Sequence, residues 1–371
     1  MLTKFKRYFV AWRNQTVASP KFQKWAGGTL IVKAIARRDA EKIYDLMAGF
    51  VYSQTLLAMV ELNLFEYLQN GPLSIELLSK KARISKNNMK ILCQSATAIK
   101  ILELIDDEQY CLSRLGAAVI GVPGLTDMIR HHRLFYDDLK DPVGLLRNEV
   151  ETHMSQYWPY VINGDKRRII DRKVAAIYSD LMRSSQKLVA EETLRLVSFS
   201  STKRLLDIGG GTGAFIEQLL EITAGIHFCL FDLPQVVEKV EPISFFQKND
   251  NQFEVMAGSF VTDEIPSGFD TMTLVRVLYD HDDDVVISLL RKVYLSLPEG
   301  GKVIISEPMS GGKNPIRSGD SYFGFYTMAM STGRPRSPEE HEKFLRMSGF
   351  QKVKKYKGNR EFITQVIVAI K

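Results

Sequence analysis

The sequence predicts a two-domain α/β protein, with a mainly helical domain over residues 1–198 and a C-terminal domain over residues 199–371 built on a parallel sheet covered by helices. Three observations lead to this prediction. The chain has 371 residues, more than one hydrophobic core usually supports. Apolar residues follow helical spacing between Asp39 and about Leu104. From Lys203 onward, short apolar strands alternate with helical stretches.

The first 38 residues form a basic arm that contains no acidic residue. Its nine cations are Lys4, Lys6, Arg7, Arg13, Lys21, Lys24, Lys33, Arg37 and Arg38. Aromatic residues, Trp12 and Trp25 among them, lie between these cations. Basic residues mixed with Trp and Phe fit a helix that lies on an anionic membrane surface. A solvated arm that packs on the fold fits the same composition, so both interpretations stay open.

The overall composition narrows the class of protein. Hydrophobic residues make up 45% and charged residues 25%, which is ordinary for a soluble globular protein. The three cysteines, Cys93, Cys111 and Cys229, are far apart and odd in number, so they indicate neither a disulfide framework nor a zinc site. No secretory signal is recognisable, and the apolar runs are shorter than a membrane span needs. We therefore expect a cytoplasmic protein without a metal.

The helical domain carries the signals of a winged helix. Apolar residues at three- and four-residue spacing fill residues 40–68, and Gly71-Pro72 ends that pattern. Ser74 and Ser85 are suited to cap two short helices, and a hairpin is expected about Asp106-Asp107. A winged helix can bind DNA. The second of these helices is poor in arginine and rich in Ile, Leu and Ala, so we expect it to pack rather than to enter a groove.

Five apolar strands are expected in the C-terminal domain, separated by helical stretches. They are RLLDI at 204–208, HFCLFD at 227–232, QFEVMA at 252–257, DTMTLVRV at 270–277 and KVIISE at 302–307. Two more strands, QKVKKY and ITQVIVAI, close the chain. This alternation predicts a parallel sheet with both faces covered, and a ligand at the carboxyl ends of its strands.

A glycine run follows the first of these strands. Gly209, Gly210, Gly211 and Gly213 let the backbone turn tightly and approach a ligand closely. Asp232 ends the next strand, 19 residues after Gly213, where a carboxylate can accept hydrogen bonds from ribose hydroxyls. These residues indicate a nucleoside-containing cofactor, and on them alone NAD stays open beside other cofactors.

The ordered motifs of the C-terminal half resemble a known family. LLDIGGGTG, FDLP at 231–234, AGSF at 257–260, LVRVLYDHDD at 274–283 and VIISEP at 303–308 resemble the class I, S-adenosylmethionine-dependent O-methyltransferases of plants and bacteria that act on small molecules. The family pairs a helical, winged-helix dimerisation domain with a Rossmann-like C-terminal domain. The resemblance covers nearly the whole chain and implies a homodimer that binds S-adenosylmethionine and no nucleic acid.

A narrower resemblance involves longer strings. ASPKFQKWAG, LMAGFVYSQ, HHRLFYDDLKDPVGLLR, YWPY and YFGFYTMAMSTGRPRSPEE are similar to the hydroxyneurosporene (demethylspheroidene) O-methyltransferases of bacterial carotenoid synthesis. Members of that group methylate the C1 tertiary hydroxyl of an acyclic carotenoid, so the resemblance implies an apolar carotenoid substrate. An O-methyltransferase for a phenol or polyketide is the alternative enzyme. A winged-helix DNA-binding regulator with a methyltransferase-like sensor domain is the alternative of another class.

The resemblance assigns the cofactor-binding residues one by one. Gly209 falls where the family contacts the methionine end, and Asp232 falls on the ribose ligand. Ser259 and Phe260 fall on the pair flanking the adenine, although the family usually has an acid at the position of Ser259. Arg276 falls where the family often has a lysine near the cofactor, and a surface cation is the other interpretation. The expected cofactor-binding set is Asp207, Gly209, Gly210, Gly211, Asp232, Leu233, Ser259, Phe260 and Arg276.

The catalytic position departs from the family. Phenol-methylating members carry His-Asp-Trp with the histidine as base, whereas the aligned residues here are Tyr279, Asp280 and His281. Glu307 matches the first supporting acid of the family, and Pro335 stands where the second would be. An alcohol is a weak acid, so its proton is expected to leave late, to a nearby acceptor. His281 has the better intrinsic pKa and Tyr279 the better aligned position. Both remain candidates, as does neither, with His281 then capping the next helix.

Overall fold

The computed structural model describes residues 2–157, 172–223, 225–238, 240 and 253–371. The chain divides into two compact units, Met1–Ile120 and Gly121–Lys371. The helices between 121 and 198 therefore group with the sheet domain by their contacts. The boundary expected at residue 198/199 lies two residues beyond the end of helix α11, Arg172–Leu196, and stays a prediction about where the cofactor-binding domain begins.

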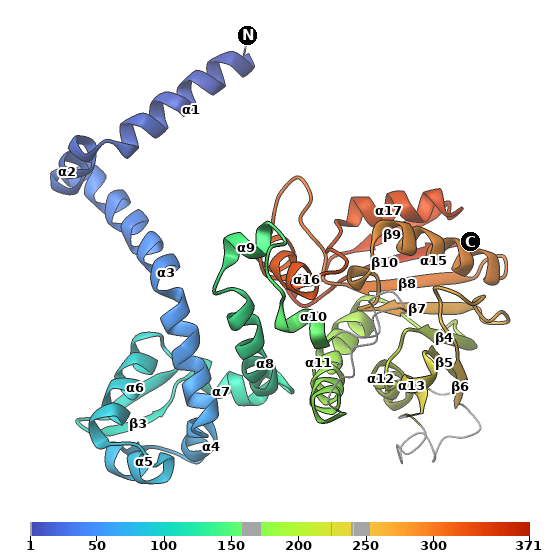
Figure 1. The fold of residues 1–371 in the computed structure, drawn as a ribbon, viewed down its shortest axis with the longest axis horizontal. Helices are drawn as coiled ribbons and strands as arrows, with labels where there is room; N and C mark the ends of the chain where they lie inside the picture. The colour runs from blue at the N-terminus through green and yellow to red at the C-terminus, as the bar shows by residue number, and fades with distance from the viewer. Residues whose placement is uncertain (1, 158–171, 224, 239, 241–252) are drawn as a thin grey trace. The chain divides into compact units, whose positions relative to one another are not determined.

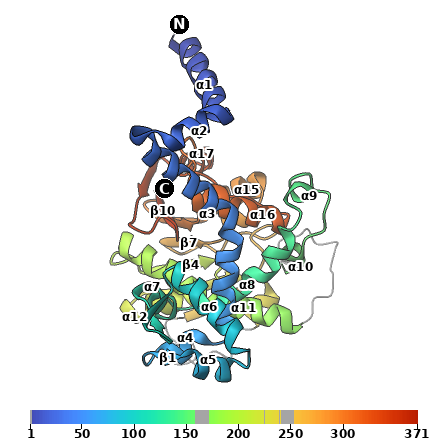
Figure 2. The ribbon, with the colours of Figure 1, turned by 90° about the vertical axis from the view of Figure 1, so that its left-hand side faces the viewer.

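The first unit begins with three successive helices, α1 (Leu2–Ala18), α2 (Pro20–Gly28) and α3 (Leu30–Glu61) (Figure 2). A small domain follows at the end of α3. Its elements are α4 (Leu64–Leu68), β1 (Leu73–Ser74), α5 (Ile75–Ala82), α6 (Lys86–Ala98), β2 (Leu102–Asp106), β3 (Gln109–Leu112) and α7 (Arg114–Gly121). The strands form an antiparallel sheet in the order β1-β3-β2.

The capping signals read from the sequence are confirmed in this unit. The Ser74 side chain accepts from the Leu77 amide at the start of α5, and the Ser85 side chain accepts from the Asn88 amide at the start of α6. Each of these bonds satisfies one of the backbone donors that a helix leaves unpaired at its first turn. The hairpin of β2 and β3 lies where it was expected.

Helix α3 is longer and more apolar than expected from the sequence. The helix Val32–Glu61 is long and apolar enough to cross a membrane by length and composition alone, because an 18-residue window within it has a mean hydropathy of 1.3, and 17% of that window is buried. The expectation that no segment reaches this length is therefore wrong. Polar residues such as Tyr52, Ser53 and Gln54 interrupt the apolar sequence, so no long apolar run is visible. These residues carry no charge, so the mean hydropathy remains high.

The second unit is built on a seven-stranded sheet in the order β6-β5-β4-β7-β8-β10-β9 (Figure 1). The strands are β4 (Arg204–Ile208), β5 (His227–Asp232), β6 (Phe253–Ala257), β7 (Thr271–Val275), β8 (Lys302–Glu307), β9 (Lys352–Tyr356) and β10 (Gln365–Ile370). All seven expected strands are present, although Gln252 lies outside the described residues. Five are parallel, and β10 runs antiparallel to both β8 and β9. The sheet is thus mixed rather than wholly parallel.

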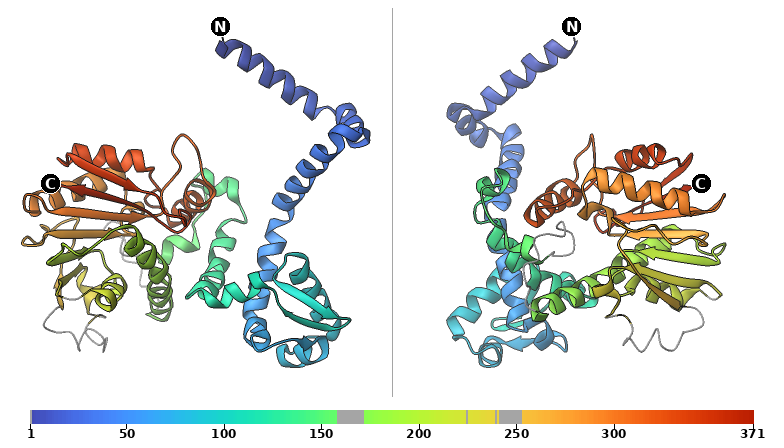
Figure 3. Two further views of the ribbon diagram at one scale, coloured as in Figure 1. Left: turned by 180° about the vertical axis from the view of Figure 1, so that it is seen from behind. Right: turned by 45° about the vertical axis from the view of Figure 1, so that its right-hand side comes forward.

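Helices cover both faces of this sheet (Figure 3). On one face, α15 (Asp283–Ser296) and α17 (Pro338–Met347) bury Leu290 and Leu345 against alternate strand residues. On the other face, α11 and α12 (Ala214–Ile222) bury Ala190 and Phe215 against the remaining ones. Burial on both faces explains why the strands are continuous apolar runs in the sequence.

A third, smaller cluster lies in the same unit and is rich in aromatic residues. Its helices are α8 (Leu125–Asp138), α9 (Pro142–Leu146), α10 (His153–Tyr157), the π-helix η3 (Arg317–Phe323) and α16 (Gly324–Met330). Phe135 of α8 packs with Tyr326 and Met330 of α16. Both long strings that resemble the carotenoid enzymes, residues 131–147 and 322–340, run through this cluster. The YWPY string lies almost wholly outside the described residues.

Candidate functional site

The loops after strands β4 to β8 meet at one edge of the sheet. Because β4 has β5 on one side and β7 on the other, the chain changes direction across the sheet here. Such a switch point is where parallel sheets bind ligands. Gly209 lies where three of the loops meet, since a methyl group added to it would be 2.9 Å from Val277 Cγ2 and 3.7 Å from Phe260 Cε1.

The glycine loop is shaped by contacts that exclude side chains. A side chain on Gly210 would collide with Asp207 Oδ2 and Leu230 Cδ1. Gly211 has a φ of +60° with open space around it, so this position requires glycine for its backbone conformation rather than for packing. The loop leads into the first turn of α12, with Gly213 in the capping position.

Asp232 holds the glycine loop through its side chain. Its Oδ2 accepts from the Gly211 amide at 2.8 Å and its Oδ1 accepts from the Leu233 amide at 2.7 Å. Burial raises the pKa of Asp232 to about 6, while these two amides favour its ionised form. Leu233 caps the short helix α13, Pro234–Val237, and thereby completes the turn after β5.

Asp207 is a buried acid beneath the glycine loop. Its Oδ1 accepts from the Thr273 hydroxyl at 2.6 Å, and its Oδ2 has no hydrogen-bond partner among the described residues. Burial raises the pKa of Asp207 to about 7, and the nearby charge of Asp232 adds to this rise. A buried oxygen without a partner next to a glycine turn suits a polar ligand group that arrives there.

The turn after β6 carries Ser259 and Phe260. The Ser259 amide donates to Asp263 Oδ2 at 2.8 Å, and the Ser259 hydroxyl accepts from the Val261 amide at 3.3 Å. Lys292 of α15 holds the same turn, because its Nζ donates to the carbonyls of Phe260, Val261 and Asp263 at 3.0, 3.0 and 2.8 Å. No motif marks Lys292 in the sequence, because its partners lie about 30 residues away along the chain.

Arg276 begins the turn after β7 in an uncommon backbone conformation. Its φ is +58°, which costs a residue with a side chain about 1–2 kcal/mol. The guanidinium is not a surface cation, because Nη1 donates to Ser185 Oγ at 2.8 Å and to Gln186 Oε1 at 3.4 Å on α11. Burial raises the pKa of both Tyr279 and Asp280, and the nearby charge of Arg276 opposes that rise in part.

Tyr279 and His281 point toward different neighbours, although only one residue separates them. Tyr279 is buried with its ring 5.8 Å from that of Phe323 in η3. The His281 ring lies perpendicular to that of Phe260, 5.1 Å away. Tyr279 therefore faces the aromatic cluster, and His281 faces the turn that follows β6.

The ionisation states of the two side chains also differ. Burial lowers the pKa of His281 to about 4, so its imidazole is neutral at physiological pH. Burial, reinforced by the charge of Asp280, raises the pKa of Tyr279 far above its ordinary value. The phenol therefore keeps its proton and can donate a hydrogen bond, whereas the imidazole can accept one.

Glu307, at the end of β8, holds the backbone of the turn that follows β7. Its Oε1 accepts from the amides of Val277 and Leu278, both at 2.8 Å. Its Oε2 has no partner among the described residues. Burial raises the pKa of Glu307 to about 7, and the backbone amides oppose this rise. The acid thus supports the turn through backbone groups, and no described imidazole is hydrogen-bonded to it.

Two histidine–tyrosine pairs line the aromatic cluster. His131 Nε2 lies 2.9 Å from the Tyr326 hydroxyl, and His132 Nε2 lies 2.7 Å from the Tyr322 hydroxyl. Burial lowers the pKa of His131 to about 4 and lowers that of His132 as well. Both imidazoles are neutral, and in the part of the chain that the structure describes no group of three His, Cys, Asp or Glu side chains could hold a metal.

Comparison with known proteins places this site in a family. Residues 136–351 match the O-methyltransferase domain, and residues 44–121 match the O-methyltransferase dimerisation domain. The chain belongs to the O-methyltransferase family. The site of this O-methyltransferase, from Asp207 to Glu307, lies inside the first match.

Curated relatives and solved structures extend the comparison. The demethylspheroidene O-methyltransferase of Rhodobacter capsulatus is 43% identical over 91% of this chain and 84% of its own length. The demethylspheroidene O-methyltransferase of Cereibacter sphaeroides is 40% identical over 95% of this chain and 93% of its own. The crystal structure of human N-acetylserotonin methyltransferase in complex with SAM is 21% identical, covers 90% of this chain and 97% of its own, and has a TM-score of 0.75. At this level of identity, the similarity to the human structure shows only that the two chains share a fold.

Proposed function

We propose that this O-methyltransferase transfers a methyl group from S-adenosylmethionine to the C1 hydroxyl of an acyclic carotenoid of the hydroxyneurosporene or demethylspheroidene type. The observation that carries the proposal is the 43% and 40% identity, over nearly the whole chain, to two bacterial demethylspheroidene O-methyltransferases. The aromatic cluster along α8, η3 and α16 supports it, because aromatic and Met side chains suit a long polyene.

The residues at the carboxyl edge of the sheet fit S-adenosylmethionine, which supplies a methyl group activated on a sulfonium. Gly209, Gly210 and Gly211 leave room where side chains would collide or strain the backbone. Asp232 would accept hydrogen bonds from the ribose hydroxyls, and Asp207 Oδ2 is a buried oxygen without a partner among the described residues. Ser259, Phe260 and Leu233 would flank the adenine, and Arg276 would fix the turn beside the cofactor.

His281 is the proton acceptor that we propose. An oxygen that has gained a methyl group is a strong acid, so a neutral imidazole takes its proton even when burial holds the pKa of that imidazole near 4. Tyr279 keeps its own proton and would orient the substrate hydroxyl by hydrogen bonding. Glu307 would hold the turn that carries both. Positioning and exclusion of water then account for much of the rate.

Analysis of the product tests the assigned reaction. The enzyme is incubated with methyl-labelled S-adenosylmethionine and a hydroxylated acyclic carotenoid in liposomes, and the extract is examined by mass spectrometry. One label per free C1 hydroxyl, as a methoxy group, is expected. Label on carbon, or no label on the carotenoid under conditions where the protein binds S-adenosylmethionine, would overturn the proposal.

We propose a homodimer formed through the dimerisation domain. One region of α3, within the residues matched to that domain, exposes apolar side chains that a second copy would cover. They are Tyr44, Leu46, Met47, Phe50 and Val51, from 45% to 83% exposed. Coverage by a partner subunit also explains why an 18-residue window of α3 with a mean hydropathy of 1.3 is only 17% buried in a single chain.

We propose that the basic arm attaches this cytoplasmic enzyme to the surface of an anionic membrane. On α1, Phe5, Tyr8, Phe9 and Trp12 are spaced i, i+3, i+4 and i+7, and all are more than half exposed. Such spacing gives one aromatic stripe along the helix. Lys4, Lys6 and Arg13 flank it, and no acid offsets their charge. A carotenoid is confined to lipid, so its enzyme must reach the bilayer surface.

Sedimentation with liposomes tests this attachment without any carotenoid. Phe5→Ser combined with Trp12→Ser should release the protein from liposomes rich in anionic lipid, and S-adenosylmethionine affinity should not change. Leu295→Ser, at an exposed apolar residue of α15, is the matched control and should not release it. Full-length protein that fails to sediment with anionic liposomes, or sediments equally with zwitterionic ones, would refute the attachment. A smaller mass for the double variant would assign α1 to the dimer instead.

A further inference from the structure

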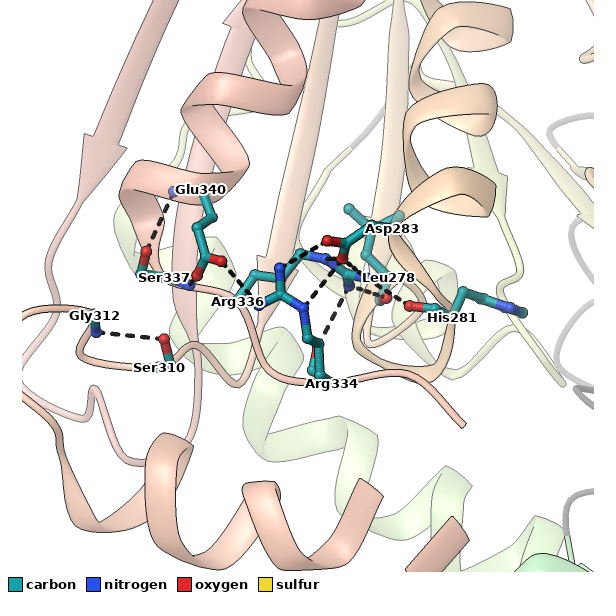
Figure 4. Close-up of polar contacts among 9 residues, drawn as sticks. All are labelled: Leu278, His281, Asp283, Ser310, Gly312, Arg334, Arg336, Ser337 and Glu340. Atoms are coloured by element: carbon teal, nitrogen blue, oxygen red, sulfur yellow. Dashed lines mark hydrogen bonds and ion pairs between the residues drawn. The ribbon is translucent and has the colours of Figure 1, made fainter. Parts of the chain in front are cut away.

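The backbone of the turn 278–281 is held from two sides by buried charges. On one side, Glu307 accepts from the amides of Val277 and Leu278. On the other, Arg336 donates from Nη1 to the Leu278 carbonyl at 2.8 Å and from Nη2 to the His281 carbonyl at 2.6 Å (Figure 4). Two amides at the start of this turn are therefore bound by a carboxylate, and two of its carbonyls are bound by a guanidinium.

Arg336 is an unusual residue in this position. Only 1% of it is exposed, and by volume it is the largest fully buried side chain among the residues that the structure describes. Its charge is balanced by Asp283, whose Oδ1 lies 2.8 Å from Nε and 2.7 Å from Nη2. Arg334 binds the same carboxylate (Figure 4). Its side chain is 42% exposed. A planar guanidinium can bind two carbonyls and a carboxylate at once, which an ammonium cannot do in the same geometry.

Residues next to Arg336 complete the contact with the turn. The Thr332 hydroxyl donates to the Asp280 carbonyl at 2.8 Å. Gly333, with a φ of +67°, packs so closely that any side chain there would collide with the Tyr279 carbonyl. The segment 332–336 therefore contacts the backbone of all four residues of the turn. Chain order puts it about 50 residues away, between α16 and α17.

We infer that the segment 332–336, with Arg336 at its centre, is a positioning element that fixes the 278–281 turn and thereby places the proton acceptor. This inference rests on the proposed function, because it takes that turn to be catalytic. In the resembling enzymes, side-chain acids orient the base. Here Pro335 stands in place of one such acid and Glu307 binds backbone amides, so the orientation comes from the backbone of the turn. Arg336 contacts carbonyls and is a positioning residue, not a catalytic one.

Two variants separate positioning from simple stabilisation. Thr332→Val removes one hydrogen bond and keeps the shape of the side chain, so it should fold. Arg336→Lys keeps the charge and loses the planar contact with both carbonyls. We expect kcat per bound S-adenosylmethionine to fall about tenfold or more in the lysine variant and a few-fold in the valine variant, since small displacements at a reacting centre cost up to about 100-fold. The dissociation constant for S-adenosylmethionine should change less than about threefold in both.

Arg336→Ala adds a readout that a structural role would not give. Free guanidinium at low millimolar concentration should restore part of its kcat by filling the vacated site, and methylammonium should not. Arg346→Ala is the matched control, because Arg346 pairs with Glu342 on the exposed side of α17. It should keep wild-type kcat with or without guanidinium.

The outcomes distinguish this inference from the proposed function. Wild-type protein that methylates no carotenoid contradicts the proposed function. Active wild-type protein together with lysine and valine variants that retain wild-type kcat per binding site contradicts the positioning role. If activity falls only in proportion to the folded fraction, measured as S-adenosylmethionine binding sites per chain, Arg336 is a structural residue and the inference is likewise overturned.

Discussion

Replacing Asp232 by alanine removes the group that links the glycine loop to the proposed ribose site. The carboxylate accepts from the amides of Gly211 and Leu233 at 2.8 and 2.7 Å. A hydrogen bond to a charged group contributes about 1.5–3 kcal/mol net. Asp232→Ala should therefore lower the free energy of unfolding by about 1–3 kcal/mol without ligand. It should also weaken S-adenosylmethionine binding by roughly 2–3 kcal/mol, which is about 30- to 150-fold.

Titration calorimetry and thermal unfolding measure the two effects separately. Glu238→Ala, at an exposed acid just after α13, is the control and should leave both unchanged. Asp232→Asn keeps one acceptor oxygen and should give an intermediate affinity. An alanine variant that binds S-adenosylmethionine within threefold of wild type would refute the ribose assignment.

The raised pKa of Asp232 predicts how affinity depends on pH. The folded protein holds this pKa at about 6, above the usual 3.8, because the group is buried. Ribose hydroxyls donate best to the ionised form, so affinity should fall as pH is lowered through about 6. The stability of the ligand-free protein should depend on pH in the opposite direction. Because the folded state raises the pKa of Asp232, this group contributes stability below about pH 3.8, and that contribution is lost as pH rises through about 6. Affinity of the asparagine variant should not follow this profile.

Three other residues and the assembly give further tests. His281→Gln should lower kcat by about 10²–10⁴-fold with S-adenosylmethionine affinity retained, whereas Tyr279→Phe should mainly raise KM; the reverse pattern would make Tyr279 the acceptor. Glu307 has its pKa raised to about 7 from 4.5, so its buried carboxyl contributes stability below about 4.5 that is lost as pH rises through about 7. The glutamine in Glu307→Gln cannot titrate. The free energy of unfolding of this variant, measured in urea, should therefore rise relative to that of wild type between pH 5 and pH 8, by about 3 kcal/mol at most. A pH-independent difference would argue against this. Light scattering at micromolar concentration should give twice the chain mass, and a monomeric mass would contradict the dimer.

Much of the fold could be predicted because each signal was local. Buried parallel strands are continuous apolar runs, so β4, β5 and β8 were placed to the residue. Ser74 and Ser85 marked helix starts because their caps span three residues. The antiparallel direction of β10 had no such signal, since it depends on which neighbour the strand meets.

The site was predictable only where a motif is contiguous. The structure brings Gly209, Asp232 and Val277 together through loops at one edge of the sheet, as the glycine run and strand order indicated. Arg336 and Lys292 could not be predicted, because each binds backbone carbonyls about 30 to 58 residues away. Every residue has such a carbonyl, so the sequence does not indicate which ones are bound. Tyr279 and His281 point in different directions because of the short helix Leu278–Asp280. No pattern in the sequence predicted this helix.

The ratio of kcat/KM for two substrates tests the central claim most directly. A hydroxylated acyclic carotenoid in anionic liposomes is compared with a simple phenol in solution, using the same labelled S-adenosylmethionine. The account predicts a ratio well above 100 in favour of the carotenoid, because the site lacks the histidine that phenol-methylating relatives use and presents an aromatic cluster instead. A ratio below one, with efficient methylation of the phenol, would contradict it.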